Sequence, residues 1–216
     1  FPDCPPHAGH AAKVAMVALL LGKSARLSSG ALQDLGIAAL IHDAGYLAPG
    51  VGEGPAALAR HSLEGARVVL RQRGFSEAKL RRLRAVLEHH RDFADPALRP
   101  STFGAILRLA EDYVNVVRLY GAKVTRDAAL GAMLKAGGKL YQPALAQLLV
   151  NALGRFPPGT LLELGDGRFA RVTAPARGPD LWDKPLARLL DPATRRPDGA
   201  LVDLARGGVI RRALPG

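Results

Sequence analysis

Histidine and acidic side chains occur along this chain at spacings that suit a metal centre. Five of the six histidines fall at positions that a metal site would use, and an aspartate directly follows one of them. Neutral imidazoles and carboxylates are good ligands for iron, manganese, nickel or zinc. Such groups on different helices can hold two ions bridged by an aspartate and a hydroxide, and bound water then becomes a nucleophile near neutral pH. The candidate ligands are His10, His42, Asp43, His61, His89 and His90, which leaves only His7 over.

Helical periodicity predicts that these side chains face a core. At about 100° per residue, candidate ligands lie in line with apolar residues of their own helices. A lone histidine in such a stripe is usually a core residue bonded to a backbone carbonyl, but ligands facing inward from four helices favour a metal site. The stripes are Val14, Val17 and Leu21 for His10; Leu32, Gly36 and Ala39 for Asp43; Ala57, Gly65 and Val68 for His61; and Leu80, Leu83 and Leu87 for His90.

The elements that position these residues are predicted to be helices, followed by a small β-containing tail. The apolar period predicts helices at about 8–22, 29–44, 55–73, 76–91, 101–120, 125–136 and 142–155. Ser29, Ser76, Ser101 and Thr125 are expected to cap four of them. Strands at 161–164 and 169–172 flank an Asp-Gly turn, and a second extended pair is expected between Leu186 and Leu204. We therefore expect a mainly α fold, with a helical metal-binding domain at 1–155 and a β-containing extension at 156–216.

Composition favours a globular protein without disulfides or membrane-spanning segments. With 216 residues and 48% hydrophobic content, the chain can bury one good core. The only cysteine, Cys4, excludes an internal disulfide and is compatible with a reducing cytoplasm. The longest apolar run, residues 14–21, is far too short to cross a bilayer, so we expect no membrane insertion. Because the chain begins at Phe1, an upstream regulatory domain is also expected.

The ordered motifs resemble the HD-GYP branch of the HD-domain metal-dependent phosphohydrolases. The order is His, then His-Asp-x-Gly, then His, then His-His, then an acidic residue on the next helix. The matching stretches are His10-Ala-Ala-Lys-Val-Ala, Ala38-Ala-Leu-Ile-His-Asp-Ala-Gly45, His61-Ser-Leu-Glu-Gly65, Val86-Leu-Glu-His-His90 and Ile106-Leu-Arg-Leu-Ala-Glu-Asp-Tyr113. Residues 138–145, 156–160 and 163–167 also resemble that family, so the resemblance extends over nearly the whole chain.

The resemblance implies a bi- or trinuclear metal centre that hydrolyses cyclic di-GMP with a metal-bridging water. Two transition-metal ions are expected, with iron favoured and manganese, nickel or zinc as alternatives. The six candidate ligands match the family's ligand positions, and Asp43 takes the catalytic, bridging place. For the last ligand, the family usually reads Ala-Asp-x-Tyr where this chain reads Ala110-Glu111-Asp112-Tyr113. Without a gap Glu111 takes the place, and helical phase agrees, which leaves Asp112 as the fallback.

The chain departs from the family pattern beside the ligands. Tyr46 stands where the family has a lysine that touches the substrate phosphate, and Arg91 stands where a glutamate could bind a third metal. Residues 92–100 lack the Gly-Tyr-Pro signature. Arg91 and Arg99 can supply positive charge instead, since a guanidinium makes paired hydrogen bonds to phosphate, and Tyr46 is a further candidate phosphate contact.

Three functions remain open on the sequence. The first is an active phosphodiesterase acting on a cyclic dinucleotide or another nucleotide. The second is an inactive nucleotide sensor or protein-binding scaffold that keeps the metal site. The third, a nucleic-acid-binding module, fits the net charge of +11 but lacks aromatic residues for base stacking and is the least favoured. It would use Arg60, Arg67, Arg71, Arg73, Arg81, Arg82 and Arg84.

Overall fold

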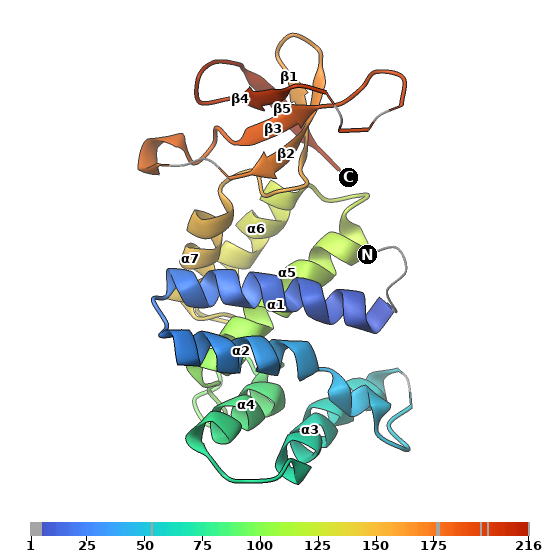
Figure 1. The fold of residues 1–216 in the computed structure, drawn as a ribbon, viewed down its shortest axis with the longest axis vertical. Coiled ribbons are helices and arrows are strands. Elements are labelled where there is room, and N and C mark those ends of the chain that lie inside the picture. Colours follow the sequence, from blue (N-terminus) through green and yellow to red (C-terminus); the bar gives the residue numbers. More distant parts are fainter. Residues whose placement is uncertain (1–5, 53, 176–177, 195, 198, 216) are drawn as a thin grey trace. The chain divides into compact units, whose positions relative to one another are not determined.

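Helices dominate the fold, and a small sheet follows them (Figure 1). The computed structural model describes residues 6–52, 54–175, 178–194, 196–197 and 199–215, so Phe1 and Cys4 lie outside the described residues. Within them the chain forms seven α-helices and then five strands, which confirms the predicted mainly α class with a small β part at the C-terminal end. No helix among the described residues combines the length and apolar character needed to span a bilayer.

The first of two compact packing units holds the helices that carry the candidate ligands. It comprises Phe1–Val114 and Ala136–Leu148. Its elements are α1 (Pro6–Ser24), α2 (Ser29–Ile41), the 3₁₀ helix η1 (Ala44–Leu47), α3 (Pro55–Arg71), α4 (Glu77–Glu88), the larger part of α5 (Thr102–Tyr120) and the first part of α7 (Pro143–Leu153). Helix α1 packs on α2, α2 on α4, and α3 on both α4 and η1 (Figure 1). The fully buried side chains include Leu21, Leu35 and Ile106, one from each of three helices.

Hydroxyl side chains begin four of the helices, largely as predicted. The side-chain oxygens of Ser76, Ser101 and Thr125 each accept a hydrogen bond from a backbone N–H three residues later. Such caps satisfy donors that the first helical turn leaves without an intrahelical partner. For α2 the prediction was wrong by one residue, because Ser28 rather than Ser29 makes this bond.

Helices α2 and α4 each end three residues earlier than their apolar pattern predicted, and both ends lie at candidate ligands. Helix α2 ends at Ile41 rather than at residue 44, so Asp43 follows the helix instead of continuing its stripe. Helix α4 ends at Glu88 rather than at residue 91, so His89 and His90 leave from its last turn. A chain that turns away from the helix axis can direct two successive side chains into one site.

The second unit, Asn115–Lys135 and Leu149–Gly216, contains the sheet. Its helices are α6 (Arg126–Lys135) and the ends of α5 and α7. Its strands are β1 (Leu161–Leu164), β2 (Phe169–Ala174), β3 (Leu186–Leu189), β4 (Leu201–Asp203) and β5 (Ile210–Leu214), with the short η2 (Pro179–Leu181) between β2 and β3. The strands are antiparallel in the order β4-β3-β2-β1-β5. Both predicted strand pairs are confirmed, whereas β5 was not predicted.

The sheet has a core of its own, built by alternation along the strands. Leu162 and Leu164 of β1 and Ala170 and Val172 of β2 point to the same buried face. The intervening Glu163 lies on the other face, where Arg211 and Arg212 bind its carboxylate. The domain boundary predicted near residue 156 stays a prediction, although residues 156–216 all fall within this second unit.

Candidate metal centre

Seven candidate ligands from five elements converge in the first unit. His10 comes from α1, His42 and Asp43 from the end of α2 and the start of η1, and His61 from the middle of α3. The others follow or lie within two more helices: His89 and His90 after α4, and Glu111 within α5. His42, His61 and His89 are fully buried, and Glu111 is 5% exposed.

Asp43 lies between two sets of imidazoles, and its two oxygens face different sets. Its Oδ2 is 3.2 Å from His42 Nε2 and 3.7 Å from His10 Nε2. Its Oδ1 is 3.5 Å from His61 Nε2. A carboxylate in this position can bridge two cations, one on each side.

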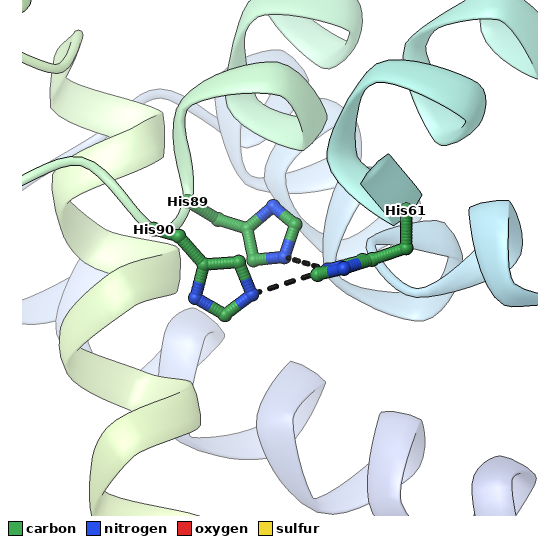
Figure 2. Close-up of side chains that lie close together, drawn as sticks. All are labelled: His61, His89 and His90. Atoms are coloured by element: carbon green, nitrogen blue, oxygen red, sulfur yellow. Dashed lines mark hydrogen bonds between the residues drawn. The ribbon is translucent and has the colours of Figure 1, made fainter. Parts of the chain in front are cut away.

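On the Oδ1 side, three imidazole nitrogens meet at short distances. The Nε2 atom of His61 lies 3.1 Å from Nε2 of His89 and 3.1 Å from Nε2 of His90 (Figure 2). Two nitrogens that bind one ion at about 2.1 Å from adjacent positions lie about 3.0–3.4 Å apart. These separations therefore fit a shared ion.

Backbone carbonyls decide which ring nitrogen carries the proton. His42 Nδ1 lies 2.7 Å from the Ala39 oxygen, and His89 Nδ1 lies 2.6 Å from the Val86 oxygen. A carbonyl oxygen only accepts, so each Nδ1 must be the N–H donor. In the neutral ring Nε2 then keeps its lone pair, and it points to the centre, as in metal-bound histidines whose other nitrogen is anchored.

Electrostatics favour the ionisation states that bind metal. Burial opposes charge on Asp43, but the hydrogen bond from His42 and the nearby histidine charges outweigh it and lower the pKa of Asp43 to about 2. Burial, with repulsion from His61, lowers the pKa of His90 to about 4. The pKa of His89 is also lowered, mainly by burial. Asp43 is thus charged and these two imidazoles are neutral at pH 7, which are the states that metal ligation requires.

Glu111 and His42 both have raised pKa values, so in the absence of a metal ion these two groups tend to keep a proton. Burial raises the pKa of Glu111 to about 8, and the charge of Asp43 adds to this. Burial lowers the pKa of His42, but the hydrogen bond and charge of Asp43 outweigh burial and raise it overall. Buried Glu111 and half-buried Asp43 face imidazoles and favour a positive charge among them, and a metal ion can replace that proton.

Among the described residues, three groups of three side chains each bring their ligand atoms within 4.8 Å of one another. Each group can hold an ion. They are His61, His89 and His90; His10, His42 and Glu111; and Asp43, His89 and Glu111. The first two groups share no residue, and Asp43 lies close to members of both. The lone pairs, charges and spacing all suit divalent metals.

Comparison with known proteins places this site in a family. The model of the HD domain family matches residues 8–126, which is more than half of the chain and includes all seven candidate ligands. The chain belongs to the HD domain family. A search of curated proteins gave no match.

Two solved structures share the fold of this HD domain. One is Bd1817, an HDG"Y"P protein from Bdellovibrio bacteriovorus, with a TM-score of 0.54 and 19% identity over 66% of this chain and 51% of that one. The other is a cyclic GMP-AMP specific phosphodiesterase, V-cGAP3, from V. cholerae, with a TM-score of 0.50 and 18% identity over 67% of this chain and 43% of that one. The chain thus spans about half the length of the structures it matches.

The fallback ligand, Asp112, has other partners in this HD domain. Its Oδ2 accepts a hydrogen bond from Arg108 Nε at 2.7 Å and another from the Tyr141 hydroxyl at 3.0 Å. Among the described residues, the converging groups of ligand atoms include Glu111 and not Asp112. This geometry favours the assignment of Glu111 as the ligand from α5.

Sequence reasoning missed Arg108, which lies beside the centre. Its guanidinium donates to the backbone oxygen of His90, and also lies 3.3 Å from Asp92. It therefore ties the turn after α4 to α5. The four-residue spacing of Arg108 and Asp112 is a helical ion-pair signal, but nothing in the sequence indicates the bond to His90.

The three candidate phosphate contacts lie in different surroundings. Tyr46 stacks on the ring of His61 and so belongs to the centre. Arg91 Nη1 lies 3.6 Å from the buried carboxylate of Glu88, and Arg99 lies over the ring of Phe93. Of the three, only Tyr46 has a direct contact with a candidate ligand among the described interactions.

Proposed function

We propose that this HD domain is a metal-dependent phosphodiesterase that hydrolyses a cyclic dinucleotide, with cyclic di-GMP as the first candidate substrate. The observation that carries the proposal is the position of Asp43, whose two carboxylate oxygens face His61 on one side and His42 and His10 on the other. In a two-ion centre the metals act together on the reacting oxygens, and a carboxylate that faces both sides can hold the two ions next to each other. Iron is the favoured metal, with manganese, nickel or zinc as alternatives.

The proposed ligands form two sets, one for each ion, with Asp43 shared between them. A pair of divalent ions bound there would supply Lewis acidity and a nucleophile that is active near neutral pH. His61, His89 and His90 would hold one ion, His10, His42 and Glu111 the other, and Asp43 would contact both. The backbone carbonyls that fix His42 and His89 hold those rings in place before any substrate arrives.

A phosphodiester substrate agrees with the charge of the protein and with its structural neighbours. The net charge of +11 favours encounter with anions. One neighbour is a phosphodiesterase specific for cyclic GMP-AMP, so both cyclic GMP-AMP and cyclic di-GMP belong in the test. Tyr46, Arg91 and Arg99 are the proposed phosphate contacts.

The deciding experiment measures metal and turnover on the same preparation. Protein purified without oxygen should carry about two transition-metal ions per chain, the number that a bridged centre holds. It should convert cyclic di-GMP or cyclic GMP-AMP to the linear dinucleotide. The double variant His42→Ala, Asp43→Ala should lose both metal and turnover. The matched control, Asp180→Ala, removes an exposed aspartate in η2, outside the centre, and should keep both. A wild-type protein without metal would refute the proposal.

A second candidate function is a nucleotide sensor that keeps the metal site but does not turn over. Its support is local: Tyr46 replaces the expected lysine, and residues 91–100 replace the glutamate and the Gly-Tyr-Pro segment. Cyclic dinucleotide binding by metal-loaded protein, without linear product after long incubation, would favour this function. Turnover would exclude it.

A further inference from the structure

The aromatic ring of Tyr46 lies flat against the ring of His61. The two ring centroids are 4.3 Å apart and the planes differ by only 6°. His61 is fully buried, and its Nε2 is the atom that meets His89 and His90 (Figure 2). One face of a central candidate ligand is therefore covered by a residue that is not itself a ligand.

His61 has the weakest backbone anchor of the three buried histidines. Its Nδ1 lies 3.3 Å from the Ala57 oxygen, whereas the corresponding distances are 2.7 Å for His42 and 2.6 Å for His89. A hydrogen bond from Nδ1 normally fixes the orientation of a metal-bound imidazole. In His61 that bond is longer, so a further contact has more influence on the rotation of the ring.

The backbone of η1 holds Tyr46 in place for this role. Gly45 lies so close to α3 that a Cβ there would come within 1.8 Å of the His61 oxygen and 2.7 Å of the Gly65 nitrogen. Backbone therefore packs directly on backbone, and Tyr46, the next residue, has little freedom to move away. A parallel aromatic contact restrains rotation about the bond that joins the imidazole to its Cβ, since turning the ring would drive its edge into the phenol.

We propose that Tyr46 is a positioning residue of the metal centre, which clamps the imidazole of His61 so that Nε2 points to His89 and His90. The inference rests on the proposed function only in requiring that the centre binds metal. It also explains why this position holds an aromatic residue. A lysine has no flat face to set against the imidazole, so restoring the family's residue would weaken the metal centre.

The test compares four single variants by metal affinity, with no substrate present. Tyr46→Phe keeps the stacked ring, whereas Tyr46→Leu and Tyr46→Lys remove it. Leu47→Ala is the matched control, because this neighbour in η1 is 84% exposed. Each metal-free protein is titrated with Mn²⁺ and with Co²⁺ under anaerobic conditions, and the visible spectrum of bound Co²⁺ reports the ligand geometry.

We expect Tyr46→Phe and Leu47→Ala to bind both metals within about twofold of wild type and to keep the wild-type Co²⁺ spectrum. Tyr46→Leu and Tyr46→Lys should bind about 10- to 100-fold more weakly, the usual effect of losing a group that orients a ligand, with an altered spectrum. Circular dichroism confirms folding, and the lysine variant decides the outcome if the leucine variant does not fold. Unchanged affinity in the folded variants, or equal loss in Tyr46→Phe, would overturn the inference. A wild-type protein that binds neither metal would instead refute the proposed function.

Discussion

Replacing Gly45 by alanine should disrupt the metal centre without touching a ligand. The added Cβ would lie 1.8 Å from the oxygen of His61 and 2.7 Å from the nitrogen of Gly65, both of which belong to the backbone of α3. Non-bonded heavy atoms pack at about 3.5 Å, so η1 must retreat by about 1.5 Å or more. Asp43 directly precedes η1 and Tyr46 lies within it, so the movement displaces the proposed bridging carboxylate and the stacked ring together.

The size of this displacement determines the expected loss of metal affinity. Metal–ligand distances tolerate about 0.2 Å, and the required shift is several times larger. We expect Gly45→Ala to bind Mn²⁺ at least about 100-fold more weakly, at the upper end of the effects seen when orienting groups are lost, or about 2.7 kcal/mol. Forcing a methyl group into this contact should also lower the free energy of unfolding by about 1–3 kcal/mol.

The assay is an anaerobic Mn²⁺ titration together with urea unfolding of the metal-free protein. Gly30→Ala in α2 is the matched control, because a Cβ there meets no atom within 4 Å. It should leave metal affinity unchanged and should not destabilise the helix. If Gly45→Ala binds Mn²⁺ as tightly as the control, the close contact between η1 and α3 does not position Asp43, and the reasoning fails.

Two further predictions concern acidic residues. The first decides between Glu111 and Asp112 as the metal ligand from α5. Glu111→Gln should lower metal occupancy, whereas Asp112→Asn should leave it near the wild-type level, and elemental analysis of the two purified variants distinguishes the two candidate ligands. The second prediction concerns pH. Burial opposes charge on Asp34, but hydrogen bonds and charges from Arg81 and Arg82 outweigh it and lower its pKa below the ordinary 3.8. A carboxyl group with a lowered folded pKa adds stability at neutral pH that is lost as the pH falls below about 4. Asp34→Asn should therefore cost about 2 kcal/mol at pH 7 and much less at pH 3, as urea unfolding at both values would show; an equal cost at both would contradict the assignment.

The helices were predictable because the sequence signals for a helix lie within the helix itself and at its ends. Apolar spacing and hydroxyl caps such as Ser76 and Ser101 depend on neighbours within one or two turns. The points at which α2 and α4 end were less predictable, since Asp43 and His90 continue the helical pattern in sequence while the chain turns away. Strand β5 (Ile210–Leu214) was missed because its pairing partner, β1, lies far away along the chain.

The candidate ligands were predictable for a different reason. The chain has only six histidines, and an ordered set of five of them with an aspartate indicates the candidate site without any knowledge of packing. The groups that position those side chains have no comparable signal in the sequence. The stack of Tyr46 on His61 depends on the approach of Gly45 to Gly65, and the bond from Arg108 reaches backbone rather than a side chain.

The charge of the centre bears on the missing lysine. Of the seven proposed ligands only Asp43 and Glu111 can carry negative charge, so two divalent ions with a bridging hydroxide would leave a net charge of about +1 on the site (+4 from the ions, −2 from the acids and −1 from the hydroxide). This positive charge, in a largely buried setting, attracts a phosphodiester without help from a lysine. The replacement by Tyr46 therefore weakens the case for catalysis less than the sequence alone indicates. The altered segment at 91–100 then becomes the stronger reason to test binding and turnover separately.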